Sequence, residues 1–206
     1  MEPFRTLTAV AAPFVCHDVD TDKLIPHRFL RKPLSVGYGQ FLFFDERFTQ
    51  TGEEHADFVL NRPPYRRARI LVTGRNFGCG SSREAAVYAL SDFGIKAIIA
   101  ESYGDIFRAN CLQNGLIPIV LAEELIERIG ADLEKYPGAT VTVDLKRQTV
   151  ITPDRAAHQF DIDASRKAQI LEGLDDIDVT SRQSRAIDAF EQAYRSRLSW
   201  LPRPRE

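Results

Sequence analysis

Residues 69–121 read RILVTGRNFGCGSSREAAVYALSDFGIKAIIAESYGDIFRANCLQNGLIPIVL, and short apolar runs in this stretch alternate with longer segments of helix length. The apolar runs have the length of buried strands, which we expect at 69–73, 96–100 and 117–121. The runs after each of them predict helices at 82–93, 102–113 and 123–136, closed by glycine or proline residues. This alternation predicts a βαβαβα core in which at least part of the sheet is parallel.

The segments on either side of this core have a different pattern. Residues 139–145 and 148–152 alternate apolar and polar side chains, as half-buried antiparallel strands do, and a further strand is expected at 158–162. Before the core, a strand at 10–15 precedes an irregular region that extends to about residue 60, with short helical pieces between proline and glycine residues. The sheet is therefore expected to be mixed.

Helices are expected again after the last strand, at 163–174 and 181–198. In the second of them the apolar residues fall on one face of the helix, at Ile187, Phe190, Tyr194 and Leu198. The chain is thus predicted to be a single α/β domain over residues 1–206. It has a mixed, partly parallel sheet flanked by helices, and residues 164–206 form a C-terminal helical extension.

Composition limits the class of protein. The chain has 206 residues, of which 44% are hydrophobic, so it can form a sizeable core. Its 27 basic and 29 acidic residues leave a net charge of −2, which argues against a nucleic-acid-binding protein. The apolar runs are too short to span a bilayer, and the N-terminal residues lack the pattern of an export signal. We therefore expect a cytoplasmic protein that binds neither nucleic acid nor membrane.

The three cysteines, Cys16, Cys79 and Cys111, are widely spaced and form no Cys-x-x-Cys pair. This spacing argues against a disulfide framework and against a zinc or iron–sulfur site built by this chain. The four histidines are equally scattered along the sequence. No metal ligand is therefore assigned to the chain.

The most informative turn is TGRNFGCGSSRE at 73–84, between an expected strand and an expected helix. Its glycines permit a tight backbone with positive φ, and the helix is expected to begin near Ser82. Unpaired N–H groups at a helix start, two serine hydroxyls and the Arg83 guanidinium together form a potential anion site. The alternative is a serine that only caps the helix, with Glu84 supporting its first turn. The pattern fits neither a dinucleotide fingerprint nor a P-loop.

A second polar segment, 18–26, reads DVDTDKLIP and places three carboxylates within five residues. Such carboxylates can bind a hard cation, but the glycine turn and the distal glutamate of an EF-hand do not follow. Composition alone favours an aspartate-rich loop whose side chains accept hydrogen bonds from backbone N–H groups.

Together, residues 18–26, GRNFGCGSSRE at 74–84 and IAESYGDIFRANCLQNGLIPI at 99–119 resemble the small subunits of 3-isopropylmalate dehydratase, relatives of the aconitase swivelling domain. The resemblance extends over most of the chain. It implies a swivelling β/β/α domain and a hydro-lyase that isomerises 2-isopropylmalate to 3-isopropylmalate, by dehydration and rehydration, in leucine biosynthesis. It also implies a heterodimer or heterotetramer with a large subunit, which holds a 4Fe-4S cluster through its own cysteines. This chain would hold no cofactor and would be inactive alone.

The resemblance also implies roles at the site. Ser81 is the expected base that removes the substrate C–H proton, and Arg83 and Ser82 are expected to bind a substrate carboxylate. Thr21 and Asp22 are expected beside the leaving hydroxyl. A serine hydroxyl is a weak base, so its ionised form needs positive charge nearby.

Two departures from the family pattern concern the substrate. Ala85 stands where the family usually has a histidine, and Leu34-Ser35-Val36 replaces an arginine-containing loop that selects the substrate side chain. Arg31 is expected to bind substrate in place of that arginine. Two alternatives therefore stay open: a related dehydratase for another 2-hydroxy diacid such as a substituted malate, and a non-catalytic anion-binding subunit.

Overall fold

The computed structural model describes residues 1–198 and 200. Its strands are β1 (Thr6–Phe14), β2 (Ile70–Thr73), β3 (Ala97–Ala100), β4 (Ile117–Val120), β5 (Thr140–Asp144), β6 (Thr149–Ile151) and β7 (Ala157–Gln159). Its longer helices are α3 (Glu84–Phe93), α4 (Asp105–Gln113), α5 (Glu123–Lys135), α6 (Ala164–Glu172) and α8 (Ser184–Arg197). The shorter α-helices are α1 (Thr21–Leu24), α2 (Phe44–Arg47) and α7 (Asp176–Ser181). Between β1 and β2 lie the short 3-10 helices η1 (His27–Phe29), η2 (Leu34–Val36), η3 (Tyr38–Phe41), η4 (Val59–Asn61) and η5 (Pro63–Tyr65).

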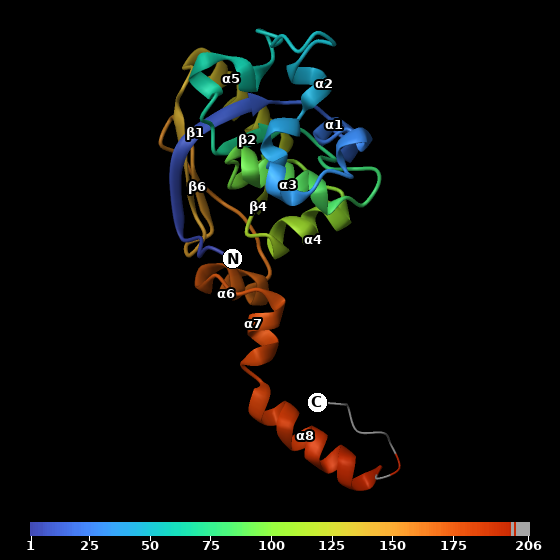
Figure 1. The fold of residues 1–206 in the computed structure, drawn as a ribbon. Helices are drawn as coiled ribbons and strands as arrows, with labels where there is room; N and C mark the ends of the chain where they lie inside the picture. The colour runs from blue at the N-terminus through green and yellow to red at the C-terminus, as the bar shows by residue number, and fades with distance from the viewer. Residues whose placement is uncertain (199, 201–206) are drawn as a thin grey trace.

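In the described part of the chain the strands form one curled sheet of seven strands, in the order β4-β3-β2-β1-β5-β6-β7 (Figure 1). Strands β1 to β4 run parallel, whereas β5, β6 and β7 are antiparallel to their neighbours. The long strand β1 joins the two halves, because its residues 6–10 pair with β5 and its residues 11–14 pair with β2. The predicted α/β fold with a mixed, partly parallel sheet is therefore confirmed.

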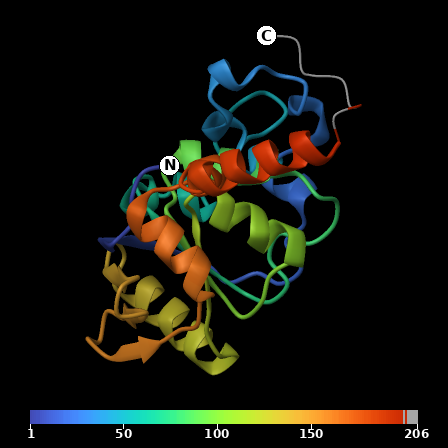
Figure 2. The ribbon, with the colours of Figure 1, turned by 90° about the horizontal axis from the view of Figure 1, so that it is seen from below.

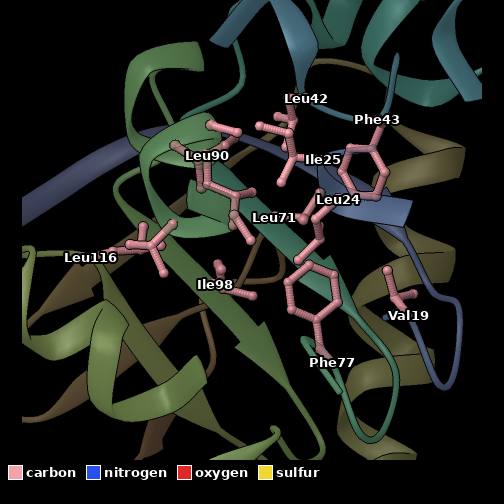
Figure 3. Packing of buried hydrophobic residues seen from close by; sticks show 14 of the residues in the cluster. Val19, Leu24, Ile25, Leu42, Phe43, Leu71, Phe77, Leu90, Ile98 and Leu116 are labelled. Carbon is pink, nitrogen blue, oxygen red and sulfur yellow. The ribbon is translucent and has the colours of Figure 1, made fainter. Parts of the chain in front are cut away.

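Alternate residues of the parallel strands face two hydrophobic cores. Leu71 and Ile98 point into the core that α3, α4 and the segment between β1 and β2 cover, which Figure 3 shows. Ile70 and Ile99 belong to the opposite core, which α5 and α6 cover. These strands read as continuous apolar runs in the sequence because both faces of this part of the sheet are buried.

Several boundaries differ from those predicted, and those of β1 and α3 have a clear physical reason. β1 begins at Thr6 rather than at residue 10, because its first half pairs with β5, a strand that is distant in the sequence. α3 begins at Glu84 rather than Ser82, because Arg83 occupies the N-cap position with an extended backbone (φ −138°, ψ 105°). The expected serine cap is not formed, and no side chain caps α3 among the described residues. Both serines before Arg83 therefore belong to the turn.

A separate short helix, which was not expected, precedes the helix expected at 181–198. Asp175 and Asp178 form a capping box that starts the separate helix α7, which ends at Ser181. α8, which corresponds to the expected helix, starts at Ser184 rather than at residue 181. A capping box is a local signal that begins a helix wherever it occurs, and here it precedes the expected start.

The C-terminal helices differ in how they contact the rest of the domain. α6 packs on the sheet through Ile170, which is fully buried. α7 and α8 contain no buried residue among those described, and both extend away from the body of the molecule (Figure 1). In Figure 2, which is seen from below, α8 therefore lies in front of the domain. Phe190 of α8 is 67% exposed and stacks on Tyr194, with 5.7 Å between ring centroids. Within the described residues, no helix combines the length and the apolar character that crossing a membrane would require.

Candidate active site

The Gly-rich turn and the start of α4 meet at the carboxyl edge of the parallel strands. The turn follows β2 and α4 follows β3, so both lie where parallel strands end, which is the usual ligand-binding edge of such sheets. The segment before α1 follows β1 at the same edge. Two backbone bridges join the three segments, Asp20 with Cys79 and Phe77 with Tyr103. The three motifs quoted above are therefore neighbours in space.

Two glycines determine the path of the turn. Gly78 has φ +73° and Gly80 has φ +86°, values that side-chain-bearing residues rarely adopt. A Cβ placed on Gly78 would lie 2.2 Å from Cγ of Phe107. The backbone N–H of Gly78 donates to the Val19 carbonyl at 2.7 Å. Glycine at position 78 thus lets the turn contact both α4 and the segment before α1.

A cavity of about 320 Å³ lies between this turn and the start of α4. The residues predicted for the site that line it are Thr21, Ser81, Ser82 and Arg83. Ile106 and Phe107 of α4 form part of its wall, and Ile106 is 56% exposed. Because Ser81 and Ser82 are also exposed, the cavity opens to solvent as a polar site beside an apolar wall.

Asp22 joins the site through Arg83. Nη1 of Arg83 donates to the Asp22 carboxylate, and this ion pair links α1 to the end of the Gly-rich turn. The Arg83 side chain is 14% exposed, whereas that of Asp22 is 53% exposed. A guanidinium has five N–H donors in a fixed fork, so donors remain for a second carboxylate. The pair can therefore hold an anionic ligand in the cavity that Ser81 also lines.

Thr21 lies beneath the turn and is 1% exposed. Its hydroxyl donates to the Ser81 carbonyl at 2.7 Å, and its backbone N–H donates to the Cys79 carbonyl at 3.0 Å. Thr21 is thus in direct contact with the backbone of the turn at two points.

Arg31 is the predicted site residue that the structure places apart from the others. It is exposed, in the turn after η1, and is not among the residues that line the cavity. The neighbouring residues Leu34, Ser35 and Val36 form η2 and line a different cavity, of about 600 Å³, together with Arg47. In this structure the substrate-loop residues are therefore not part of the Ser81 cavity.

The aspartates of the segment 18–22 bind separate partners. Asp18 accepts from Nδ2 of Asn76 at 2.8 Å, and this hydrogen bond holds the Asp18 pKa below its usual value. Asp20 accepts from the Lys23 N–H at 2.7 Å and caps α1. Among the residues that the structure describes, no group of three or more His, Cys, Asp or Glu side chains is arranged to hold a metal ion. These contacts agree with an aspartate-rich hydrogen-bonding loop.

Eight residues that line the cavity were not predicted as site residues: Asn76, Gly78, Cys79, Gly80, Gly104, Asp105, Ile106 and Phe107. Each lies within one of the motifs quoted above, so the motifs did mark the right segments. Nothing in the sequence indicates which side of the turn before α4 faces Ser81. The sequence also did not predict the positive φ of Asn76 (+55°), although asparagine adopts such values more often than most residues.

Comparisons with known proteins agree with this combination of curled sheet and Gly-rich turn. The family described as the aconitase C-terminal domain matches residues 1–124. A second family, described as LeuD_N, matches residues 127–164. The fold and the site thus define a domain of the aconitase superfamily.

Full-length relatives narrow the class. The 3-isopropylmalate dehydratase small subunit of Paramagnetospirillum magneticum is 48% identical over 201 residues, which cover 98% of this chain and 100% of the relative. That of Dinoroseobacter shibae is 47% identical with the same coverage. A solved structure of 3-isopropylmalate dehydratase from Methanocaldococcus jannaschii matches with a TM-score of 0.63 and 27% identity, covering 90% of this chain and 99% of that chain. The chain belongs to the family of 3-isopropylmalate dehydratase small subunits.

Proposed function

We propose that this chain is the small subunit of a heteromeric hydro-lyase that converts 2-isopropylmalate to 3-isopropylmalate in leucine biosynthesis. Family membership over nearly the whole chain supports the reaction and the need for a large subunit. The observation that carries the proposal is the cavity that Ser81, Ser82 and Arg83 share, with Asp22 bound to Arg83. A candidate base beside anion-binding side chains fits a dicarboxylate substrate.

In this proposal the residues of the turn have two roles, proton removal and carboxylate binding. The Ser81 alkoxide takes a proton from one substrate carbon, the C–H electron pair forms the C=C bond, and hydroxide leaves the neighbouring carbon. Rehydration then places the proton and the hydroxyl on the opposite carbons. Arg83 and Ser82 bind a carboxylate and fix the substrate in one orientation. The Arg83 charge and the N-terminus of α3 also favour the ionised form of Ser81.

The iron–sulfur chemistry belongs to the partner in this proposal. Cys111 is fully buried, and none of the cysteines belongs to a three-ligand group in the described residues, so these residues do not fit a cluster. A 4Fe-4S cluster on the large subunit would supply the Lewis acid that accepts the departing hydroxyl. The small subunit then contributes the base and the carboxylate clamp, and it is active only in the complex.

Turnover of 2-isopropylmalate by the complex with the large subunit tests the proposal. Replacing Ser81→Ala is expected to lower kcat by about 10²- to 10⁴-fold, the usual contribution of a positioned base. Because Ser81 is exposed, the complex should still assemble, which gel filtration checks. Ser165→Ala, at an exposed serine in the first turn of α6, is the matched control and should leave kcat unchanged.

Two results would contradict the proposal. A Ser81→Ala complex with wild-type kcat would remove the base and favour a non-catalytic anion-binding subunit. A wild-type complex that ignores 2-isopropylmalate but turns over another substituted malate would assign the chain to a related dehydratase. The second result would be consistent with the replaced loop at Leu34, Ser35 and Val36.

A further inference from the structure

We propose that Thr21 is a positioning residue, which acts by holding the backbone of Ser81 from beneath rather than by contacting the substrate. The inference rests on the proposed function, in which Ser81 is the base. The hydrogen bonds of Thr21 itself, in the segment 18–26, are the basis for this role.

The contacts of Thr21 leave it little freedom to act on a substrate. Thr21 is 1% exposed, and its hydroxyl donates to the Ser81 carbonyl at 2.7 Å. A hydroxyl has a single proton, so this bond uses its only donor. Thr21 therefore has no proton left to donate to a leaving hydroxyl, and its effect must pass through the turn.

The turn needs such a restraint at this point. Gly80 has φ +86°, and Ser81 and Ser82, which follow it, are exposed and lie outside any helix or strand. Glycine and exposed loop residues lose the most conformational freedom when they are fixed. A base is effective only when its reacting atom is held close to the productive position. The bond from Thr21 to the Ser81 carbonyl supplies that restraint on the proposed base itself.

Neighbouring residues of α1 thus hold both functional groups of the site. Thr21 binds the backbone at Ser81, and the next residue, Asp22, binds the Arg83 side chain. The backbone N–H of Thr21 adds a third contact, to Cys79. The start of α1 therefore holds the proposed base and the proposed carboxylate clamp in one frame.

Two substitutions separate the hydroxyl from the volume of Thr21. Thr21→Val keeps the shape and removes the hydroxyl, whereas Thr21→Ser keeps the hydroxyl. In the complex with the large subunit, Thr21→Val is expected to lower kcat at least about 10-fold with KM within about threefold of wild type, because a misplaced base slows chemistry more than binding. Thr21→Ser is expected to restore kcat to within about threefold of wild type, because it restores the bond.

Thr152→Val is the matched control. Thr152, after β6, is 4% exposed, and its hydroxyl bonds the Asp154 carboxylate and lies 3.1 Å from the Ala156 carbonyl oxygen. Thr152→Val likewise removes the hydroxyl of a buried threonine and its hydrogen bonds, but outside the Ser81 cavity, so its kcat should match wild type. If Thr21→Val does not assemble with the large subunit, Thr21→Ala replaces it in the same comparison.

Hydrogen exchange gives a readout that does not depend on turnover. In the complex, Thr21→Val should speed amide exchange in the peptide that contains residues 79–83, and Thr21→Ser and Thr152→Val should not. If the wild-type complex fails to turn over 2-isopropylmalate, the proposed function fails, while faster exchange at 79–83 still supports the positioning role. Wild-type kcat in Thr21→Val, a rise in KM alone, or loss of kcat that serine does not restore would each overturn the inference.

Discussion

Cys79 lies two residues before Ser81 and lines the same cavity. Its pKa is raised, first by burial and then by the carboxylates of Asp20 and Asp18. The thiolate is the reactive form of cysteine, so a raised pKa leaves less of it at neutral pH. Cys79 therefore combines access from the cavity with low chemical reactivity.

The reactivity of Cys79 gives a prediction at the scale of one residue. Alkylation by iodoacetamide should be slower at pH 7 than for a cysteine in a short peptide. The rate should keep rising above pH 9, because the thiolate forms only at higher pH. Asp20→Asn removes one carboxylate but keeps an oxygen that can cap α1, so it should lower the pKa and speed alkylation at fixed pH. Peptide mass spectrometry measures both rates.

Faster labelling of Cys79 than of the peptide at pH 7 would contradict this prediction. Cys111 is the internal control, because it is fully buried and should react only after unfolding.

The site residues could be predicted unequally well, for a physical reason. Ser81, Ser82 and Arg83 are joined covalently, so their proximity follows from the sequence itself. Thr21 and Asp22 came from the family resemblance, because no local pattern indicates which turn a distant segment will contact. Arg31 was predicted from the same resemblance, yet its position depends on how a long irregular segment folds, and the structure places it outside the cavity.

At the scale of elements, Gly78 connects the Gly-rich turn to α4. We expect Gly78→Ala to lower the free energy of unfolding by about 3 kcal/mol, from positive-φ strain and from the clash with the Phe107 ring. Gly52→Ala isolates the first effect: Gly52 has φ +85°, but nothing lies within 4 Å of a Cβ placed there. It should cost only about 1 kcal/mol. Urea unfolding curves measure both variants.

Equal costs for the two glycine substitutions would show that Phe107 yields and that the turn and α4 are not tightly coupled. In that case the wall of the cavity that Phe107 forms would also be adjustable.

The elements themselves were largely predictable where their signals were local. The strands β2, β3 and β4 are apolar runs in the sequence because both their faces are buried. The first half of β1 was missed because its partner, β5, lies far along the chain. The start of α3 was placed too early because a serine pair before a helix usually caps it, whereas here the pair is used by the turn.

At the scale of the molecule, α7 and α8 contribute little to the stability of the domain. Removing residues 175–206 should change the melting temperature by no more than about 2 °C, because neither helix buries a residue in the described structure. Removing residues 164–206 should lower it by several times as much, because α6 and its buried Ile170 are then lost. Differential scanning calorimetry compares the two.

Equal losses of melting temperature in the two truncations would mean that α7 and α8 pack on the domain in solution. An unchanged melting temperature without α6 would instead remove Ile170 from the residues that stabilise the sheet.

The central place of β1 has a consequence for biosynthesis. It precedes the other described strands along the chain, yet one of its neighbours begins at Ile70 and the other ends at Asp144. Residues 6–10 of β1 must therefore stay without their partner until β5 has been translated, and pairing across so long a separation is slow. During that interval this half of β1 is open to mispairing with other chains.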